Sequence, residues 1–534
     1  MGFAPIFLED ASLGESEILE SAERAEKEGN YALASELYLK AGDSFQREGK
    51  YTKARDCYLK AAINGAEGVA RKEKKDKLGL CYFNAGLAFS RLERPEKAVG
   101  CLESAVRNAR NEPWLGAAYF QLGVAYDLLG EREKSIEKHE KAVSYFMNAD
   151  NKKMVGVSYL TIAMRYFLLK KYKASIKYCE RAVPYLERAQ AESYVGDCYY
   201  YMGYSHQKLK KNIAAIDWLK RAAARYEKAE RHEKVAACYA QIGYCYGELE
   251  DYQKMLEYSQ KAIEILEERG ESAVLASSYL NAARAQIKLG DKIAAAEHLK
   301  RAIPIFENLQ NRESLVYSYI QLVNIYDEAG MYNEMLEQLE KSIPLMEGES
   351  PQTLGSWYFK IGRAYNEIGV HDQALEAYVR SLEAYTEAGD EESMGNAQMN
   401  IGGQLVHLQR YREAIIHFEE AIKHFRKVGE NQKIGRCYYN ISLAYIRMEK
   451  YGEALKPAEE TLKYAKKAKD NEIIAATLYN MGNIYIKLND SKKAMKHMEE
   501  AAKIYQQLGN REQVMKCAEK MTVSYTHLTL PTKA

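Results

Sequence analysis

The stretch YFNAGLAFSRLERPEKAVGCLESAV, from Tyr82 to Val106, decides the fold. Tyr82 lies four residues before Gly86, an aromatic residue lies three after it, and a second small residue, Ala98, lies twelve after it. Spacings of three, four and seven residues place side chains on one face of a helix. The stretch therefore predicts two amphipathic helices that are joined by a short turn.

The same pattern recurs along the whole chain. The small residue equivalent to Gly86, called the small position below, occurs at Gly42, Gly86, Gly123, Ala163, Gly203, Gly243, Ala283, Val323, Gly362, Gly402, Ser442 and Gly482. Most steps between these positions are 40 residues, and the exceptions are 44, 37 and 39. The chain has 43 Tyr but only 12 Phe and 3 Trp, because tyrosine usually stands four residues before the small position. A fixed period of this length indicates a repeat protein.

The small residues of the repeat predict how its helices pack. Glycine or alanine at facing positions lets two antiparallel helices approach closely, and no single pair can bury its apolar face without its neighbours. We expect an all-α solenoid of about twelve helix–turn–helix repeats. Residues 1–64 should form an N-terminal helical cap and the first repeat, and residues 65–521 a continuous solenoid. The 44-residue step predicts a loop and a polar helix start over residues 63–77.

The last residues break the repeat. Residues 522–534, which include VSYTHLTLPTKA, form a non-native-looking tail that resembles translated adapter sequence. We therefore expect the native protein to continue beyond about residue 521.

The stretch from Tyr82 to Val106 and the stretch LYNMGNIYIKLNDSKKAMKHMEEAAKIY, from Leu478 to Tyr505, resemble tetratricopeptide repeats (TPRs). The resemblance covers nearly the whole chain and implies a right-handed superhelical solenoid that binds other proteins. The common unit of that family has 34 residues, so this chain resembles its long-repeat members. TLYNMGNIY, from Thr477 to Tyr485, is similar to Partner of Inscuteable-type adaptors, and residues 31–62 are similar to the soluble NSF attachment proteins.

Composition excludes several classes of function. Lys and Arg total 76 and Asp and Glu total 75, whereas a nucleic-acid-binding protein would show a basic excess. No apolar run is long enough to span a bilayer, so no integral membrane partner is expected. Nine cysteines without a C-x-x-C pair indicate reduced thiols and a cytoplasmic protein.

The sequence also contains none of the common catalytic motifs. The chain has no P-loop, no G-x-S-x-G and no H-E-x-x-H motif, so we expect neither an enzyme nor a cofactor. His417 and His424 are the closest helical histidine pair, and we expect both to be solvated rather than to bind metal.

The residue two before the small position is rich in amides. Asparagine or glutamine occupies it at Asn84, Gln121, Gln241, Asn281, Gln321, Asn400, Asn440 and Asn480. The family resemblance implies that this residue points into a concave groove. Amides both donate and accept hydrogen bonds, so we expect the row to grip the backbone of an extended peptide. The alternative is that the amides tie adjacent repeats together.

Cations accompany the amides, chiefly in the second half of the chain. We include Arg284, Arg363 and Arg436 in the predicted peptide site, with Arg447 and Lys487 nearby, and expect an acidic partner segment. Tyr200, Tyr201 and Tyr204 form either a second patch for apolar anchors or part of the core.

The predicted function is a scaffold or adaptor that binds an extended peptide segment of a partner protein. Two alternatives remain open. One is a membrane-fusion adaptor of the soluble NSF attachment type. The other is the regulatory TPR arm of a longer enzyme or signalling protein.

Overall fold

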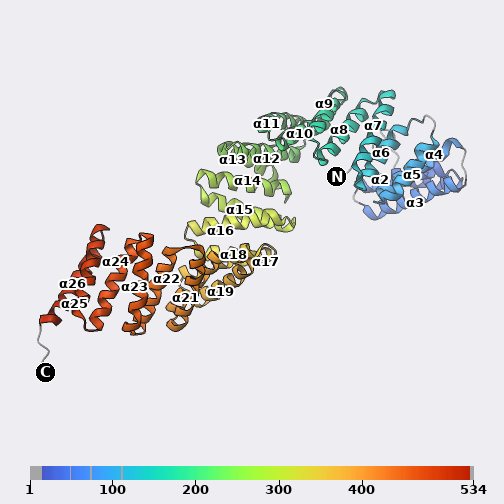
Figure 1. Cartoon of the computed structure of the whole chain (residues 1–534). Helices are drawn as coiled ribbons and strands as arrows, with labels where there is room; N and C mark the ends of the chain where they lie inside the picture. Colours follow the sequence, from blue (N-terminus) through green and yellow to red (C-terminus); the bar gives the residue numbers. More distant parts are fainter. Residues whose placement is uncertain (1–14, 49, 72–74, 110–111, 530–534) are drawn as a thin grey trace. The chain divides into compact units, whose positions relative to one another are not determined.

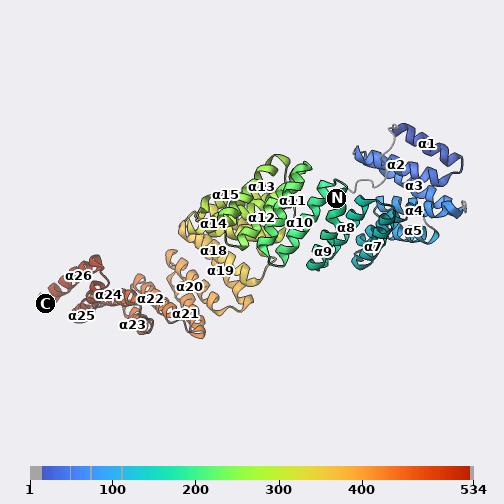
Figure 2. The same cartoon turned by 90° about the horizontal axis from the view of Figure 1, so that it is seen from above.

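The computed structural model describes residues 15–48, 50–71, 75–109 and 112–529, and every regular element in these ranges is helical (Figures 1 and 2). The chain falls into two compact units, unit 1 (Met1–Ala302) and unit 2 (Ile303–Ala534). The described residues contain twelve consecutive helix pairs, preceded by the single helix α1 (Glu15–Lys27) and followed by α26 (Arg511–Thr529). This confirms the predicted all-α repeat solenoid. Of the predicted tail, residues 530–534 lie outside the described residues.

The helices of unit 1 begin and end as follows. The first helices of its pairs are α2 (Tyr31–Arg47), α4 (Lys75–Arg91), α6 (Leu115–Leu128), α8 (Lys152–Leu168), α10 (Glu192–Lys208), α12 (His232–Glu248) and α14 (Ala273–Leu289). The second helices are α3 (Tyr51–Ala70), α5 (Pro95–Asn108), α7 (Arg132–Asn148), α9 (Tyr172–Arg188), α11 (Asn212–Lys228), α13 (Tyr252–Leu266) and α15 (Lys292–Asn308). A short 3-10 turn, η1 (Glu267–Arg269), follows α13, and the boundary between the units lies within α15.

Unit 2 has the same organisation. Its first helices are α16 (Arg312–Glu328), α18 (Pro351–Glu367), α20 (Glu391–His407), α22 (Asn431–Arg447) and α24 (Asn471–Lys487). Its second helices are α17 (Tyr332–Met346), α19 (His371–Ala388), α21 (Tyr411–Val428), α23 (Tyr451–Ala468) and α25 (Ser491–Gln507). Most helices have 17 residues, which accounts for a repeat longer than the common 34-residue unit.

The small position sets the distance between the two helices of a pair. A Cβ atom added to Gly86 would lie 2.6 Å from Leu102 Cγ, and one added to Gly402 would lie 2.7 Å from Phe418 Cε1. In both cases the facing residue comes 16 residues later, on the second helix of the same pair. The expectation that small residues allow close approach is therefore confirmed, and these two glycines each accommodate one large buried side chain.

In four repeats, tyrosine joins the first helix of a pair to the preceding element. Four tyrosines that lie four residues before the small position donate a hydrogen bond to a glutamate twelve residues earlier: Tyr38 to Glu26 (2.8 Å), Tyr239 to Glu227 (3.1 Å), Tyr279 to Glu267 (2.7 Å) and Tyr319 to Glu307 (3.0 Å). The tyrosine ring packs between its own helix and the preceding element, and its hydroxyl donates to the glutamate carboxylate of that element. Phenylalanine could fill the space but could not supply the donor, which explains the excess of tyrosine.

Replacing Tyr319 with phenylalanine should therefore destabilise unit 2. Tyr319 is buried and its hydroxyl lies 3.0 Å from Glu307 Oε1. Loss of this bond to a charged acceptor should lower the free energy of unfolding by about 1–2 kcal/mol. Urea denaturation would measure it. The control is Tyr317→Phe, whose side chain is 37% exposed and makes no hydrogen bond within the described residues. Equal unfolding midpoints for the two variants would contradict the role of the hydroxyl.

The prediction of a loop from residue 63 is wrong, because α3 continues to Ala70. Its glycines are packing residues rather than signals of a turn. A Cβ atom on Gly65 would lie 2.8 Å from Ala85 Cβ, and one on Gly68 would lie 2.6 Å from Cys81 Sγ. The helix therefore uses glycine to let α4 approach, and residues 72–74 of the predicted loop lie outside the described residues.

Candidate protein-binding groove

The first helices of successive pairs lie against one another. α2 contacts α4, α8 contacts α10, α12 contacts α14 and α22 contacts α24, whereas no comparable contact joins the second helices of successive pairs in the described residues. The first helices of each unit therefore line its inner face. Figure 1 shows this stacking of pairs in both units.

Three positions on each first helix face this inner side. They are two residues before, one after and five after the small position, and their spacing of three and four makes them one stripe. Side chains from this stripe reach the preceding first helix: Lys360 Nζ donates to Asn324 Oδ1 at 3.1 Å, and Arg91 Nε lies 3.1 Å from Asp43 Oδ1. We call this stripe the inner row.

Two of the predicted amides hold adjacent repeats together. Asn84 is 3% exposed, and its Nδ2 donates to the carbonyl of Ala32 on α2 at 3.2 Å. Asn281 is 8% exposed, and its Nδ2 donates to the carbonyl of Ala240 on α12 at 3.4 Å. At these two positions the amide links two adjacent first helices, as the alternative interpretation of the row predicts.

The other amides are more accessible. Asn400 donates to the carbonyl of Asn396 in its own helix at 2.8 Å, and Asn480 donates to the hydroxyl of Tyr439 on α22 at 3.2 Å. Both remain partly exposed. Four further amides are half-buried, and their side chains make no hydrogen bond within the described part of the chain: Gln121, Gln241, Gln321 and Asn440. Their donors and acceptors are open to a ligand.

The predicted cations differ in their surroundings. Arg363 forms an ion pair with Asp327 of α16, and Lys360 Nζ lies 3.8 Å from the same carboxylate. Burial lowers the pKa of Lys360. Arg284 is half-buried and Arg436 is exposed, and neither has an acidic partner among the described residues. The positive charge of α18 is therefore neutralised within unit 2, whereas that of Arg436 is not.

The inner row of α20, α22 and α24 combines amides with unneutralised cations. It consists of Asn400, Gly403, His407, Asn440, Leu443, Arg447, Asn480, Asn483 and Lys487. None of the nine is a carboxylate. Arg447 and Lys487 are exposed and make no ion pair in the described ranges. A pocket of about 310 Å³ lies beside them, lined in part by Ile446, Tyr479, Asn483, Ile486 and Lys487.

Sequence reasoning missed Asn483 and this pocket. The residue one after the small position faces the same side as the residue two before it, as the Arg363–Asp327 pair shows. Asn483 lies one residue after the small position Gly482, so the repeat register itself marks it.

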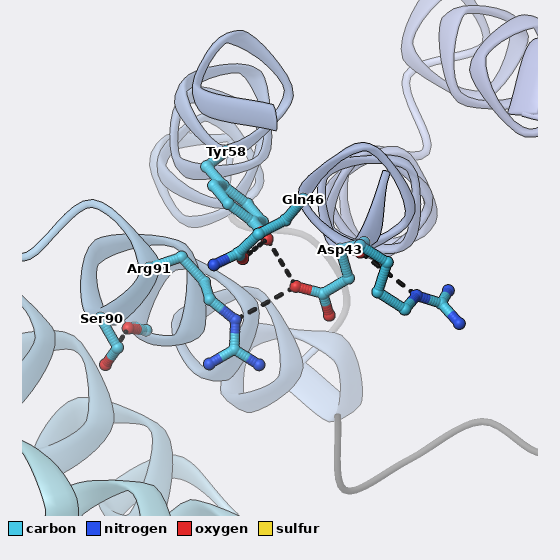
Figure 3. Close-up of polar contacts among 7 residues, drawn as sticks. Asp43, Gln46, Tyr58, Ser90 and Arg91 are labelled. Atoms are coloured by element: carbon cyan, nitrogen blue, oxygen red, sulfur yellow. Dashed lines mark hydrogen bonds and ion pairs between the residues drawn. The ribbon is translucent and has the colours of Figure 1, made fainter. Parts of the chain in front are cut away.

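The inner face of the first two pairs is chemically different. The Tyr58 hydroxyl donates to Asp43 Oδ1 at 2.7 Å and lies 2.7 Å from Gln46 Oε1, while Arg91 approaches the same carboxylate (Figure 3). Burial and the Asp43 carboxylate raise the pKa of Tyr58. The charges of this cluster satisfy one another, so it ties α2, α3 and α4 together.

The histidines form separate contacts. His417 Nδ1 lies 2.6 Å from Gln398 Oε1, and His424 Nδ1 lies 2.6 Å from Glu391 Oε2. The described residues contain no group of three His, Cys, Asp or Glu side chains arranged to hold a metal ion. Among them, no helix is both long and apolar enough to cross a membrane.

Family models match the chain in several places. A tetratricopeptide-repeat model matches residues 194–268, 235–308 and 393–467, and a second one matches residues 475–508. The chain is a TPR-repeat protein. Its N-terminal region is similar to another family, since the soluble NSF attachment protein model matches residues 18–187. TPR domains in general bind other proteins. No curated protein matches the chain at a significant level.

Solved structures resemble the TPR chain at low identity. The apo form of RapI is 14% identical, with a TM-score of 0.46, and the match covers 70% of this chain and 98% of RapI. Yeast Tom70 is 15% identical, with a TM-score of 0.32 and coverage of 86% and 98%. BtubC from P. vanneervenii is 19% identical, with a TM-score of 0.35 and coverage of 43% and 92%. Because these three TM-scores are below 0.5, the fold assignment rests on the helix pairs and the family models.

Proposed function

We propose that this TPR protein is an adaptor and that the inner row of α20, α22 and α24 holds an extended acidic segment of a partner protein. The observation that carries the proposal is the composition of that row, with amides at Asn400, Asn440, Asn480 and Asn483 and exposed cations but no carboxylate. The proposal assigns no catalytic step to the chain.

The two kinds of side chain have separate tasks. An extended segment has backbone N–H and C=O groups that lack partners within the segment, and the amide of Asn440 can both donate to and accept from them. Arg447 and Lys487 lie one repeat apart at equivalent positions, so they suit carboxylates spaced along the same segment. The pocket beside Asn483 has room for an apolar side chain of the ligand.

The match over residues 18–187 supports a second candidate, an adaptor of the soluble NSF attachment type. That candidate predicts recruitment to membranes that carry fusion proteins. A flotation assay with such membranes would test it, and absence of recruitment would dispose of it.

Removal of the exposed cations of α22 and α24 tests the first candidate. The variant Arg436→Gln/Arg447→Gln/Lys487→Gln should bind a fluorescent acidic peptide about tenfold more weakly than the wild type, since charges at an interface contribute modestly each. Fluorescence anisotropy would measure the dissociation constant. The matched control removes three cations from second helices, Arg380→Gln/Lys423→Gln/Lys463→Gln, which pair with Glu376, Glu420 and Glu460. Equal weakening by both triple variants would refute the proposed site.

Truncation of one amide separates binding from folding. Asn440→Ala removes a side chain with no hydrogen bond of its own in the described residues, so the unfolding temperature should stay nearly constant. Binding should weaken by about threefold to tenfold, the value of one hydrogen bond. Asn84→Ala should lower the unfolding temperature and leave peptide binding unchanged. The reason is that the buried Asn84 amide donates to the carbonyl of Ala32 and faces no ligand. An Asn440→Ala protein that binds normally would exclude the amide from the site.

A further inference from the structure

On α10 of unit 1, the inner row carries aromatic rings where α20, α22 and α24 of unit 2 carry amides. Tyr201 and Tyr204 occupy it on α10, and both are half-buried. Phe167, at the end of α8, lies 5.6 Å from Tyr201 and 4.8 Å from Tyr204 between ring centroids. Tyr172, at the start of α9, lies 5.4 Å from Phe167. These four rings form one continuous cluster that joins the end of α8, the start of α9 and the inner side of α10.

Tyr200, which the sequence grouped with these tyrosines, lies 5.9 Å from Tyr201 and 6.0 Å from Tyr204 between ring centroids, but it also reaches the core. It packs against the core formed by Ala215, Ile216 and Leu219 on α11. The interpretation as a core residue therefore holds for Tyr200. Tyr201 packs in part against the core beside Cys179 and Cys198, and it and Tyr204 lie on the inner face.

Lysines surround the aromatic cluster. No Asp or Glu occurs in residues 160–179 or 198–216. The two turns that follow α8 and α10 present five exposed lysines without an ion pair in the described residues: Lys170, Lys171, Lys208, Lys210 and Lys211. Lys208 Nζ lies 5.1 Å from the centroid of Tyr204, which places this charge directly beside the rings.

Two carboxylates close to Arg165 and Tyr201 already have partners. Asp127 pairs with Arg165 at 2.7 Å, and Asp197 accepts from Lys234 and Tyr226, each at 2.6 Å. The lysines of the two turns therefore keep their positive charge. Two exposed aliphatic side chains complete the surface, Leu168 at 48% and Ile213 at 77%.

We propose that this aromatic and basic surface of unit 1 binds an acidic protein segment that carries an apolar or aromatic anchor. The anchor would lie on Phe167, Tyr201 and Tyr204, since rings provide large contact area at low entropic cost. The acidic residues beside it would face the five lysines, whose unneutralised charge complements them. Tyr201 and Tyr204 lie half-buried between helices, a geometry that suits an inserted side chain better than a flat lipid surface. This surface is distinct from the inner row of α20, α22 and α24.

The turns after α8 and α10 allow a variant that removes charge without destabilising the fold. Lys170 and Lys210 adopt left-handed backbone conformations, with φ of 58° and 59°, whereas glycine stands at the equivalent turn after α6, at Gly130. Glycine adopts this conformation without steric cost. Lys170→Gly/Lys210→Gly should therefore remove two charges while the unfolding temperature stays constant or rises. Weaker binding by this variant would not be attributable to loss of the fold.

The experiment uses three short fluorescent peptides and the full chain with Arg436→Gln/Arg447→Gln/Lys487→Gln as the background, so that binding of acidic peptides by α22 and α24 does not contribute. The first alternates Asp or Glu with Leu and Phe, the second replaces its acids with Asn and Gln, and the third replaces its apolar residues with Ser. Only the first should bind tightly, and Lys170→Gly/Lys210→Gly should weaken it about tenfold. Leu168→Ser/Ile213→Ser should also weaken it. The control Lys254→Gln/Lys261→Gln removes two lysines paired with Asp251 and Glu257 and should have no effect.

Several results would overturn the proposal. They are equal binding of the first and third peptides, an effect of the control as large as that of the glycine variant, and no change in the glycine variant. Sedimentation with phosphatidylserine vesicles but no binding of the first peptide would indicate a lipid surface instead. The variants of α22 and α24 leave this surface untouched, so failure of the proposed function and failure of this inference are distinguishable.

Discussion

Replacing Gly402 with alanine should lower the free energy of unfolding of unit 2 by about 2–3 kcal/mol, near the upper end for an overpacked core. The new Cβ atom would lie 2.7 Å from Phe418 Cε1 and 2.8 Å from Cδ1. Phe418 is 0% exposed, so its ring has no free space to move into. The pair α20 and α21 would have to separate, and the packing against both neighbouring pairs would be disturbed.

The adjacent glycine is the matched control. A Cβ atom on Gly403 would meet nothing within 4 Å, because this residue faces the inner side. Gly403→Ala should therefore stabilise unit 2 by up to about 1 kcal/mol through helix propensity. Phe418→Leu should partly rescue Gly402→Ala, since Ala283 already faces Leu299 at the equivalent positions. Equal unfolding midpoints for the two alanine variants in urea would show that the proposed register of α20 on α21 is wrong.

Unit 1 should lose stability at acidic pH because of His139. This residue is 0% exposed, its ring lies 4.7 Å from that of Phe120, and neither ring nitrogen has a hydrogen-bond partner. Burial and the nearby Arg165 cation lower the pKa of His139 to about 3. In the unfolded chain a histidine has a pKa of about 6.5. Between these two values the unfolded chain binds a proton that the folded chain does not bind.

The sign and size of the effect follow from this difference. Above about pH 6.5 both states are neutral and His139 causes no pH dependence. Below it, stability falls as pH falls, by about 1.4 kcal/mol per pH unit, so the loss by pH 5 should be about 2 kcal/mol. His139→Leu should remove this contribution, because Leu102 and Leu219 occupy the equivalent position in other pairs.

Urea unfolding at pH 7 and pH 5 would measure the loss in the wild type and in His139→Leu. His232→Gln serves as the control, since His232 is exposed at the start of α12. The wild type and the control should lose stability in parallel, and His139→Leu should lose less. A loss of the same size in all three proteins would contradict the account of His139.

The sequence predicted the helix pairs well because their packing rule is local. Gly402 faces Phe418 through a fixed spacing of 16 residues, and tyrosine reaches a glutamate twelve residues back. Such spacings lie within one repeat or between adjacent ones, so a period in the sequence reveals them. The same logic failed over residues 63–70, because a step of 44 residues suggests an inserted loop, whereas α3 instead continues as a 20-residue helix to Ala70.

The candidate site was only partly predictable. Asn84 and Asn440 occupy equivalent positions, yet the first is buried against Ala32 and the second is open. The difference depends on how closely successive first helices approach, which the repeat period does not encode. Similarly, Arg363 is neutralised by Asp327 of the preceding repeat, a pairing that only the placement of α16 beside α18 shows.

Site-specific photo-crosslinking tests the central claim, that unit 2 holds an acidic segment along the inner row of its first helices. A photoreactive residue would replace Leu443, on the inner row of α22, or Ile416, which is 57% exposed on α21. The account predicts a crosslink to the acidic peptide from position 443, lost when Arg436, Arg447 and Lys487 are replaced, and none from position 416. Crosslinks of equal yield from both positions would contradict it.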